Sequence, residues 1–115
     1  LLRIRDEYGN TPTMITENGA GFGDIDEVRD GNRIHDPLRT DYILRHADAV
    51  VQAVTEGADV RGYMVWSLCD NFEWIQGYTR RFGMVHVDFD TQERTPKDSL
   101  GAYSTMIARY RQAGF

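Results

Sequence analysis

Two short apolar segments, each followed by a loop and then a helical pattern, constrain the fold of this chain more than any other feature. The first covers residues 13–16 and the second residues 60–68. Met14 and Ile15 are adjacent and both apolar, which favours a short parallel strand buried on both faces over a half-solvated strand. Consecutive strand–loop–helix units predict parallel strands with right-handed crossovers, and therefore an α/β fold.

Helix signals surround these strands. Leu1, Ile4 and Tyr8 have helical spacing, and the Gly9-Asn10 pair marks the end of that helix. Asp36 is expected to cap a second helix with its carboxylate, with Pro37 at the first helical position. The apolar stripe of this helix consists of Ile43, Ala47, Val50 and Val54, and Glu56-Gly57 ends it.

The remaining segments have weaker patterns. Residues 24–33 are acidic and rich in turn formers, which predicts a long surface loop. Residues 84–89 alternate like a strand or a hairpin arm. The last helix is predicted to have Thr95 as its cap and Pro96 at its first position. Its buried face would consist of Leu100, Tyr103, Ile107 and Tyr110.

Glu17 stands where the first strand ends and an Asn-Gly turn begins. Parallel strands carry their chemistry at this carboxyl end, so Glu17 is a candidate functional residue. Taken alone, a glutamate before Asn-Gly is more simply a solvated turn residue. The neighbouring loop has to decide between the two interpretations.

The loop after the second strand combines two tryptophans and a phenylalanine with three interleaved polar side chains, Asp70, Asn71 and Glu73. Sugars fit such a surface, because their C–H faces stack on flat rings and their hydroxyls need paired acceptors and donors. An aromatic core cluster is the alternative for Trp66 and Trp74. The interleaved polar groups weaken that alternative, since a core would have to satisfy each of them.

Composition excludes several classes of protein. The net charge of −5 argues against nucleic acid or an anionic membrane as partner, and no apolar run approaches the ~20 residues of a membrane helix. The single cysteine, Cys69, excludes an internal disulfide and a Cys-rich metal site and is compatible with the cytoplasm. The three histidines have no metal-like spacing, and residues 19–23 do not fit a dinucleotide fingerprint. We therefore expect no cofactor and no metal, and a cytoplasmic location.

Two long motifs make the chain recognisable: Ile-Thr-Glu-Asn-Gly at 15–19 and Trp-Ser-Leu-Cys-Asp-Asn-Phe-Glu-Trp at 66–74. Together with the segments at 77–83, 87–89 and 94–99, they resemble glycoside hydrolase family 1, the β-glucosidases. The resemblance covers essentially the whole chain but only about the last quarter of the family's chain. It implies that residues 1–115 are the C-terminal fragment of one (β/α)8 TIM barrel domain, with its strands 7 and 8 here and an incomplete barrel.

The resemblance also implies roles. Glu17 would be the nucleophile of a retaining β-glycosidase that removes non-reducing β-D-glucosyl units through a covalent glycosyl-enzyme. Glu73 and Trp74 would hold the sugar, Trp66 would lie under it, and Phe82 would form a wall. A non-proline cis bond would follow Trp66. Relatives that act on 6-phosphorylated glycosides have serine, lysine and tyrosine at positions 73, 80 and 82, so Glu73 and Phe82 imply an unphosphorylated β-glucoside or cello-oligosaccharide.

The second carboxyl group of a retaining pair is not found in this sequence. The family carries its acid/base in a Thr-x-Asn-Glu-Pro motif on the fourth strand, and no such motif occurs here. The other glutamates, Glu7, Glu27, Glu56 and Glu93, have helix or turn settings. The chain is therefore expected to need the remainder of the barrel as its partner. The alternative is a sugar-binding or structural fragment with no hydrolysis of its own.

Overall fold

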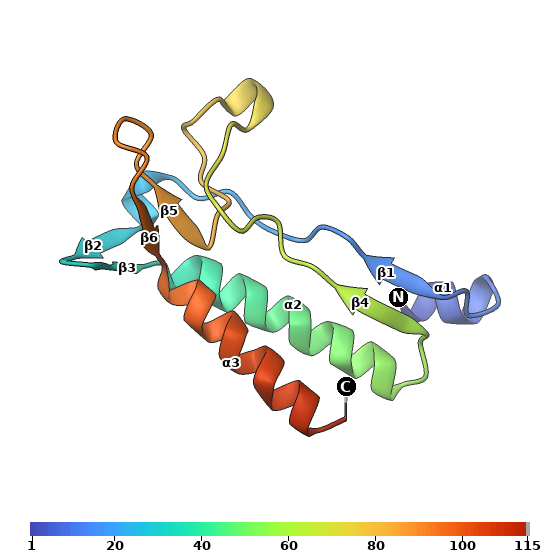
Figure 1. The fold of residues 1–115 in the computed structure, drawn as a ribbon. Helices are drawn as coiled ribbons and strands as arrows, with labels where there is room; N and C mark the ends of the chain where they lie inside the picture. The colour runs from blue at the N-terminus through green and yellow to red at the C-terminus, as the bar shows by residue number, and fades with distance from the viewer. Residues whose placement is uncertain (115) are drawn as a thin grey trace.

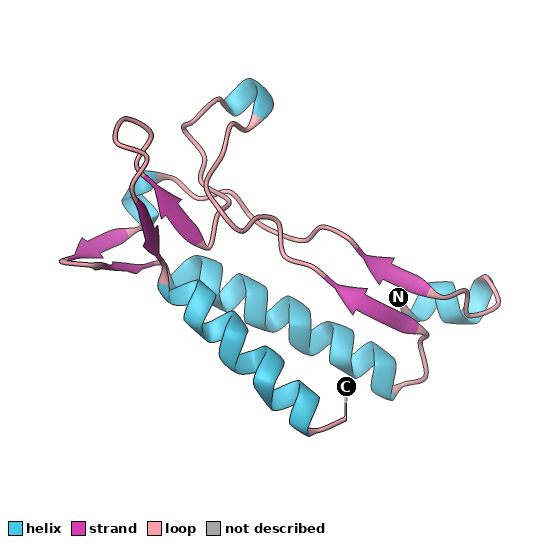
Figure 2. Ribbon diagram, in the orientation of Figure 1, coloured by secondary structure: helices cyan, strands magenta, loops and turns pink. Residues whose placement is uncertain are grey.

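The computed structural model describes residues 1–114. Two long helices lie side by side, a pair of parallel strands runs along one of them, and the loops and hairpins gather at one end (Figures 1 and 2). The radius of gyration of the Cα atoms is 15.9 Å. In chain order the elements are α1 (Leu2–Glu7), β1 (Thr13–Ile15), the 3-10 turn η1 (Asp24–Asp26), β2 (Val28–Asp30), β3 (Arg33–His35), α2 (Pro37–Thr55), β4 (Val60–Tyr63), the 3-10 turn η2 (Trp74–Gln76), β5 (Val85–Val87), β6 (Arg94–Pro96) and α3 (Asp98–Gln112).

The two predicted strands pair in parallel, as expected. Thr13 is opposite Val60 and Ile15 is opposite Tyr63. The expectation that β1 is covered on both faces is wrong for the described residues, since Met14 is 52% exposed. Only α2, among the described elements, packs appreciably against this pair, so one face stays open. The second strand also ends at Tyr63 rather than continuing to residue 68.

The helix α2 begins at Pro37, as predicted, and its stripe includes the buried Ile43 and Ala47. Asp36 occupies the N-cap position, but its carboxylate does not cap α2. Instead it accepts hydrogen bonds from the amide and the hydroxyl of Ser99, in the first turn of α3, at 2.9 and 2.6 Å. The predicted cap is therefore in the right place and caps a different helix.

The predicted start of the last helix is wrong. Thr95 and Pro96 lie in β6, where they pair with β5, and α3 begins at Asp98 after Lys97. The sequence pattern suggested a local cap, but the carboxylate of Asp36, 63 positions away in the sequence, accepts from the Ser99 amide in the first turn of α3. Residues 94–96 are thus free to form the second arm of a hairpin. The strand predicted at 84–89 is confirmed as the first arm of this hairpin, but it covers only Val85–Val87.

The segment 24–33 is not a plain surface loop. It contains η1 and most of the antiparallel hairpin β2–β3, in which Val28 pairs with His35. The side chain of Glu27 is only 5% exposed, because it points inward to Arg39 and Lys97. An acidic, turn-rich composition predicted solvent exposure, whereas the hairpin folds one acidic side chain into the interior.

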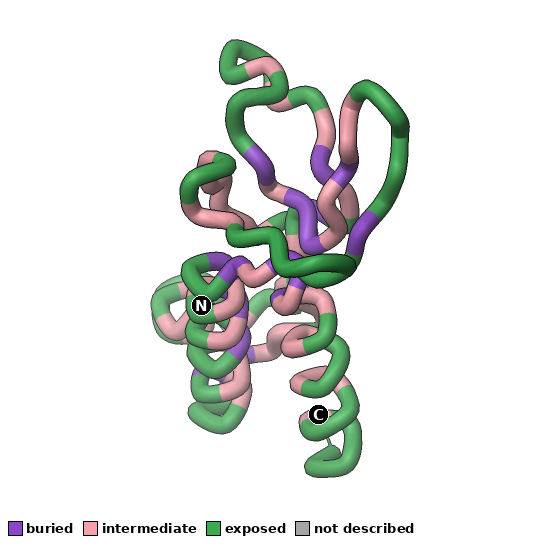
Figure 3. Tube along the Cα trace, turned by 90° about the vertical axis from the view of Figure 1, so that its left-hand side faces the viewer, coloured by how far each residue is buried: buried purple, intermediate pink, exposed green. Residues whose placement is uncertain are grey.

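Most of the buried residues gather where the loops meet the first turns of α2 and α3, and others follow α2 (Figure 3). Within residues 1–114, charged and polar side chains are as common there as apolar ones, including Asp36, Arg39, Asp70 and Lys97. The described residues form an α/β arrangement with three separate two-stranded sheets and no closed barrel. No helix in the described part of the chain is long and apolar enough to cross a bilayer.

Candidate active site

The carboxyl ends of β1 and β4 continue side by side beyond the sheet. The Met64 amide donates to the Ile15 carbonyl at 2.9 Å, and the Trp66 amide donates to the Asn18 carbonyl at 3.0 Å. The residues that leave the two strands are therefore neighbours, although they lie about fifty positions apart in the sequence. This brings Glu17 next to the segment that begins with Trp66.

Glycine at position 19 is required by this close approach. A Cβ atom there would lie 1.7 Å from the carbonyl oxygen of Trp66, far inside contact distance. Gly21 has the same function for the opposite wall, since a Cβ there would lie 2.4 Å from the ring of Phe82. The two glycines thus let the segment after Glu17 pack directly against Trp66 and Phe82.

The peptide bond between Trp66 and Ser67 is cis, as the family resemblance implied. The chain then forms a protruding loop whose outer part contains η2. Trp74 is 82% exposed, Glu73 is half-buried, and Phe82 lies where the loop returns.

All five predicted site residues line one cavity of about 560 Å³. Its walls bring together two carboxylates, two indole rings and a phenyl ring, and the complete lining is Glu17, Asn18, Gly19, Trp66, Glu73, Trp74 and Phe82. Among residues 1–114, no side chain forms a hydrogen bond with the carboxylate of Glu17 or Glu73. Both groups are therefore available to a ligand, and the lining has the acceptors and flat apolar faces that a sugar ring needs.

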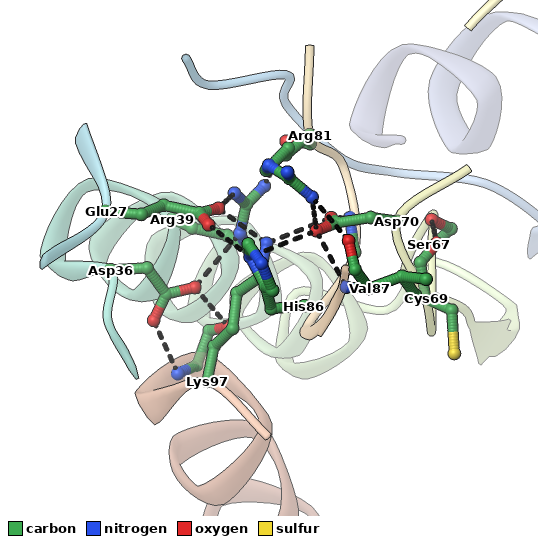
Figure 4. Close-up of polar contacts among 12 residues, drawn as sticks. Glu27, Asp36, Arg39, Ser67, Cys69, Asp70, Arg81, His86, Val87 and Lys97 are labelled. Carbon is green, nitrogen blue, oxygen red and sulfur yellow. Dashed lines mark hydrogen bonds and ion pairs between the residues drawn. The ribbon is translucent and has the colours of Figure 1, made fainter. Parts of the chain in front are cut away.

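A buried ionic network, which the sequence patterns did not predict, includes Asp70 and Arg81 from the segment that also carries Glu73 and Phe82 (Figure 4). Lys97 Nζ donates to Glu27 at 2.5 Å and to Asp70 at 2.9 Å, and Arg81 donates to Asp70 at 2.8 Å. Arg39 completes it with bonds to Asp36 at 3.0 Å and to Glu27 at 2.5 Å. These residues come from five separate segments with no common periodicity, so no local pattern could have grouped them.

The network changes the interpretation of two polar residues in the aromatic loop. Asp70 points into the network rather than toward the cavity, and Asn71 donates to Ser67 Oγ at 3.0 Å and to the Cys69 carbonyl at 3.1 Å. Only Glu73, of the three interleaved polar groups, lines the cavity. The sugar-facing surface is thus narrower than the sequence suggested.

Glu27, Asp70 and His86 also place ligand atoms within 4.8 Å of one another, which is a possible metal arrangement. The ammonium group of Lys97 already bonds to both of these carboxylates. Because a cation of the protein already pairs with both carboxylates, the chemistry of this group is that of an ion-pair network.

Comparison with known proteins agrees with the resemblance. The family model described as glycosyl hydrolase family 1 matches residues 1–112. The chain is 50% identical to β-glucosidase A of Enterobacter agglomerans, over 93% of this chain and 22% of that protein. It is also 41% identical to 6-phospho-β-galactosidase of Staphylococcus epidermidis, over 92% of this chain and 23% of that protein.

Solved structures give the same result. The chain superimposes on the family 1 β-glucosidase of Exiguobacterium antarcticum B7 with a TM-score of 0.88 and 47% identity, covering 97% of this chain and 24% of that one. The chain therefore spans about a quarter of the length of the proteins it matches.

Proposed function

This chain belongs to glycosyl hydrolase family 1, and from that premise we propose that it is the C-terminal part of a retaining β-glucosidase. The observation that carries the proposal is the single cavity that brings Glu17, Trp66, Glu73, Trp74 and Phe82 together at the carboxyl ends of two parallel strands. In barrel enzymes this end of the strands forms the active site. Residues 1–115 would supply the last two βα units, strands 7 and 8, of one (β/α)8 domain.

Glu17 would act as the nucleophile. Its carboxylate attacks the anomeric carbon, the bond from that carbon to the aglycone oxygen breaks, and the sugar remains as an ester of Glu17. The departing oxygen takes a proton from an acid/base glutamate in the upstream part of the barrel. Water then attacks the same carbon, the same group accepts its proton, and Glu17 is released with overall retention.

The other cavity residues would bind the non-reducing sugar. Glu73 would accept from hydroxyls, Trp74 would hold the same ring, and Trp66 would stack beneath it. Phe82 would form one wall of the sugar-binding cavity. The carboxylate of Glu73 would repel a 6-phosphate, which favours an unphosphorylated β-glucoside or cello-oligosaccharide as substrate.

The test is covalent labelling of the full-length form, with the upstream residues restored. An activated aryl β-glucoside needs little protonation of its leaving group, so it reports on the nucleophile separately from the acid/base. We expect hydrolysis and a glycosyl adduct on the peptide that contains Glu17, detected by mass spectrometry. Glu17→Gln should abolish both, whereas Glu7→Gln, a matched change on the exposed helix α1, should leave both unchanged.

A second candidate is a sugar-binding or structural fragment with no hydrolysis of its own. It is favoured by one observation, that Glu17 and Glu73 are the only carboxylates along the cavity in the described residues, and Glu73 has a binding role. A full-length form that binds glucosides, hydrolyses none and never labels Glu17 would establish this candidate and refute the enzyme proposal.

A further inference from the structure

The loop from Asp70 to Gly83, here called the sugar loop, carries Glu73, Trp74 and Phe82, and its two ends touch. The Gly83 amide donates to Asp70 Oδ1 at 2.9 Å. A Cβ atom at Gly83 would lie 2.1 Å from the backbone nitrogen of Asp70. The Asp70 carboxylate thus bonds across the neck of the sugar loop. It lies beside backbone hydrogen bonds from the Ser67 amide to the Phe82 carbonyl at 3.2 Å and from the Met84 amide to the Ser67 carbonyl at 3.0 Å.

The Asp70 side chain is itself firmly held (Figure 4). It is 4% exposed, its Oδ2 accepts from Arg81 Nη1 at 2.8 Å, and its Oδ1 also accepts from Lys97 Nζ at 2.9 Å. Lys97 is the N-cap residue of α3, and Arg81 precedes Phe82. The neck is therefore anchored to the helical layer by charged hydrogen bonds in a buried setting, which are the strong kind.

The tip of the sugar loop is ordered within itself but packs little against the rest. The Glu73 amide donates to the Gly77 carbonyl at 2.7 Å, and the Gly77 amide donates to the Trp74 carbonyl at 3.0 Å. Trp74 is 82% and Ile75 is 98% exposed. Outside the tip, the ring of Tyr78 packs against Phe89 with centroids 4.4 Å apart. The position of the tip relative to Glu17 therefore depends on this ring contact and on the neck.

We propose that Asp70 is a positioning residue for the sugar site. It does not line the cavity, and it acts by fixing the neck so that Glu73, Trp74 and Phe82 face Glu17. The proposal deepens the glycosidase function and rests on it. Among residues 1–114, no other side chain bonds to both ends of the sugar loop.

The first test is Asp70→Asn in the full-length form. A carboxylate accepts hydrogen bonds at both oxygens, whereas an amide accepts at only one. In the variant, either the two donors to Oδ1, Gly83 and Lys97, or the donor to Oδ2, Arg81, therefore lose their acceptor. We expect kcat/KM for an aryl β-glucoside to fall by about 10²-fold, the effect of misplacing binding groups by about 1 Å. Amide hydrogen exchange at Glu73 and Gly77 should become faster.

Ser99→Ala is the matched control. Ser99 is equally buried and bonds to Asp36 in the same region, but it has no contact with the sugar loop. It should lower Tm while leaving kcat/KM and loop exchange within about twofold of the parent. If Asp70→Asn and Ser99→Ala lower kcat/KM in proportion to their Tm losses, Asp70 is merely structural and the proposal is wrong.

A double-mutant cycle with Glu73→Gln separates positioning from general damage. If Asp70 acts through the sugar loop, Asp70→Asn should cost at least tenfold less in kcat/KM once Glu73 has been replaced. Independent, multiplicative losses would contradict the proposal.

The wild-type protein provides a test that depends on neither variant folding nor activity. The Gly83 amide should exchange far more slowly than the amides of the tip, because it bonds to a buried carboxylate. Equal exchange rates would contradict the hydrogen bond from the Gly83 amide to Asp70, and with it the proposal. If the full-length form shows slow Gly83 exchange but hydrolyses no glucoside, the proposed function is wrong, whereas the hydrogen bond between Asp70 and Gly83 is supported. Failure of the proposed function can therefore be distinguished from failure of the positioning proposal.

Discussion

The side chain of Tyr63, in β4, forms a half-buried hydrogen bond with the segment that carries Glu17. Its hydroxyl donates to Asn18 Oδ1 at 2.8 Å, and Asn18 is the residue next to Glu17. Burial raises the pKa of Tyr63 to about 12, and the neighbouring hydroxyls of Tyr103 and Tyr42 add to the effect. The neutral phenol is therefore the form that the fold favours.

This raised pKa predicts a loss of stability at high pH. The contribution of Tyr63 is fully present below pH 10, its ordinary pKa, and is lost as the pH rises towards 12. Tyr63→Phe should remove this pH dependence in the full-length form and cost about 1–3 kcal/mol at pH 8, because Asn18 loses its donor. Denaturant unfolding at pH 8 and pH 11 measures both effects.

Tyr8→Phe is the control for that experiment, since Tyr8, which precedes β1 in the sequence, is an exposed tyrosine. It should change neither the stability at pH 8 nor the slope above pH 10. Equal behaviour of the two variants would show that Tyr63 has no special role.

At the residue scale, the five predicted site residues lie around one cavity, whereas the residues that support them were not predicted. Glu17 and Trp66 each follow an apolar strand, and parallel strands end at the same edge, so their proximity follows from the pattern. Asp70 lies within the same polar and aromatic run as Glu73 and was interpreted in the same way. Its real partners, Gly83 and Lys97, are 13 and 27 positions away and leave no local signal.

The helices α2 and α3 are joined at their first turns by Asp36. The predicted start of α2 was right because proline and an acidic residue act locally. The predicted start of α3 was wrong because the amide of Ser99, in its first turn, bonds to Asp36, 63 positions away. A helix end that is capped by a residue distant in the sequence cannot be predicted from local sequence patterns. The buried face of a helix can be predicted from its apolar periodicity, as at Ile43 and Ala47.

Asp36→Asn is therefore expected to destabilise the helical layer. Asp36 is 1% exposed and bonds to Arg39 at 3.0 Å and to Ser99, so its replacement leaves a buried guanidinium short of a partner. Breaking such a pair costs about 3–5 kcal/mol. The free energy of unfolding of the full-length form, from denaturant titration, measures the loss.

Asp98→Asn is the matched comparison, because Asp98 lies at the start of α3, as Asp36 lies at the start of α2, but it pairs near the surface with Arg33 and His35. Surface pairs contribute about 0–1 kcal/mol, so this variant should unfold almost like the parent. A loss at Asp98 as large as that at Asp36 would mean that burial does not decide the effect.

The whole molecule is more extended than a domain of its length. Its radius of gyration is 15.9 Å, whereas a compact chain of this size would have about 13 Å. Met14 in β1 and Met64, directly after β4, are exposed. Within residues 1–114, β1 and β4 pair only with each other. Open strand edges and an uncovered apolar face are the features that a closed barrel removes.

We therefore predict that the 115 residues alone do not fold cooperatively as a monomer. Heating the isolated chain should give a broad, shallow change in far-UV circular dichroism, and sedimentation should show association through the open β1–β4 edges. The full-length form should melt in one sharp transition, because upstream strands would cover Met14 and Met64. A sharp melt of the monomeric 115-residue chain would contradict this prediction. It would also show that the ionic network of Asp70, Lys97 and Glu27 suffices to hold the helices and loops together without the rest of a barrel.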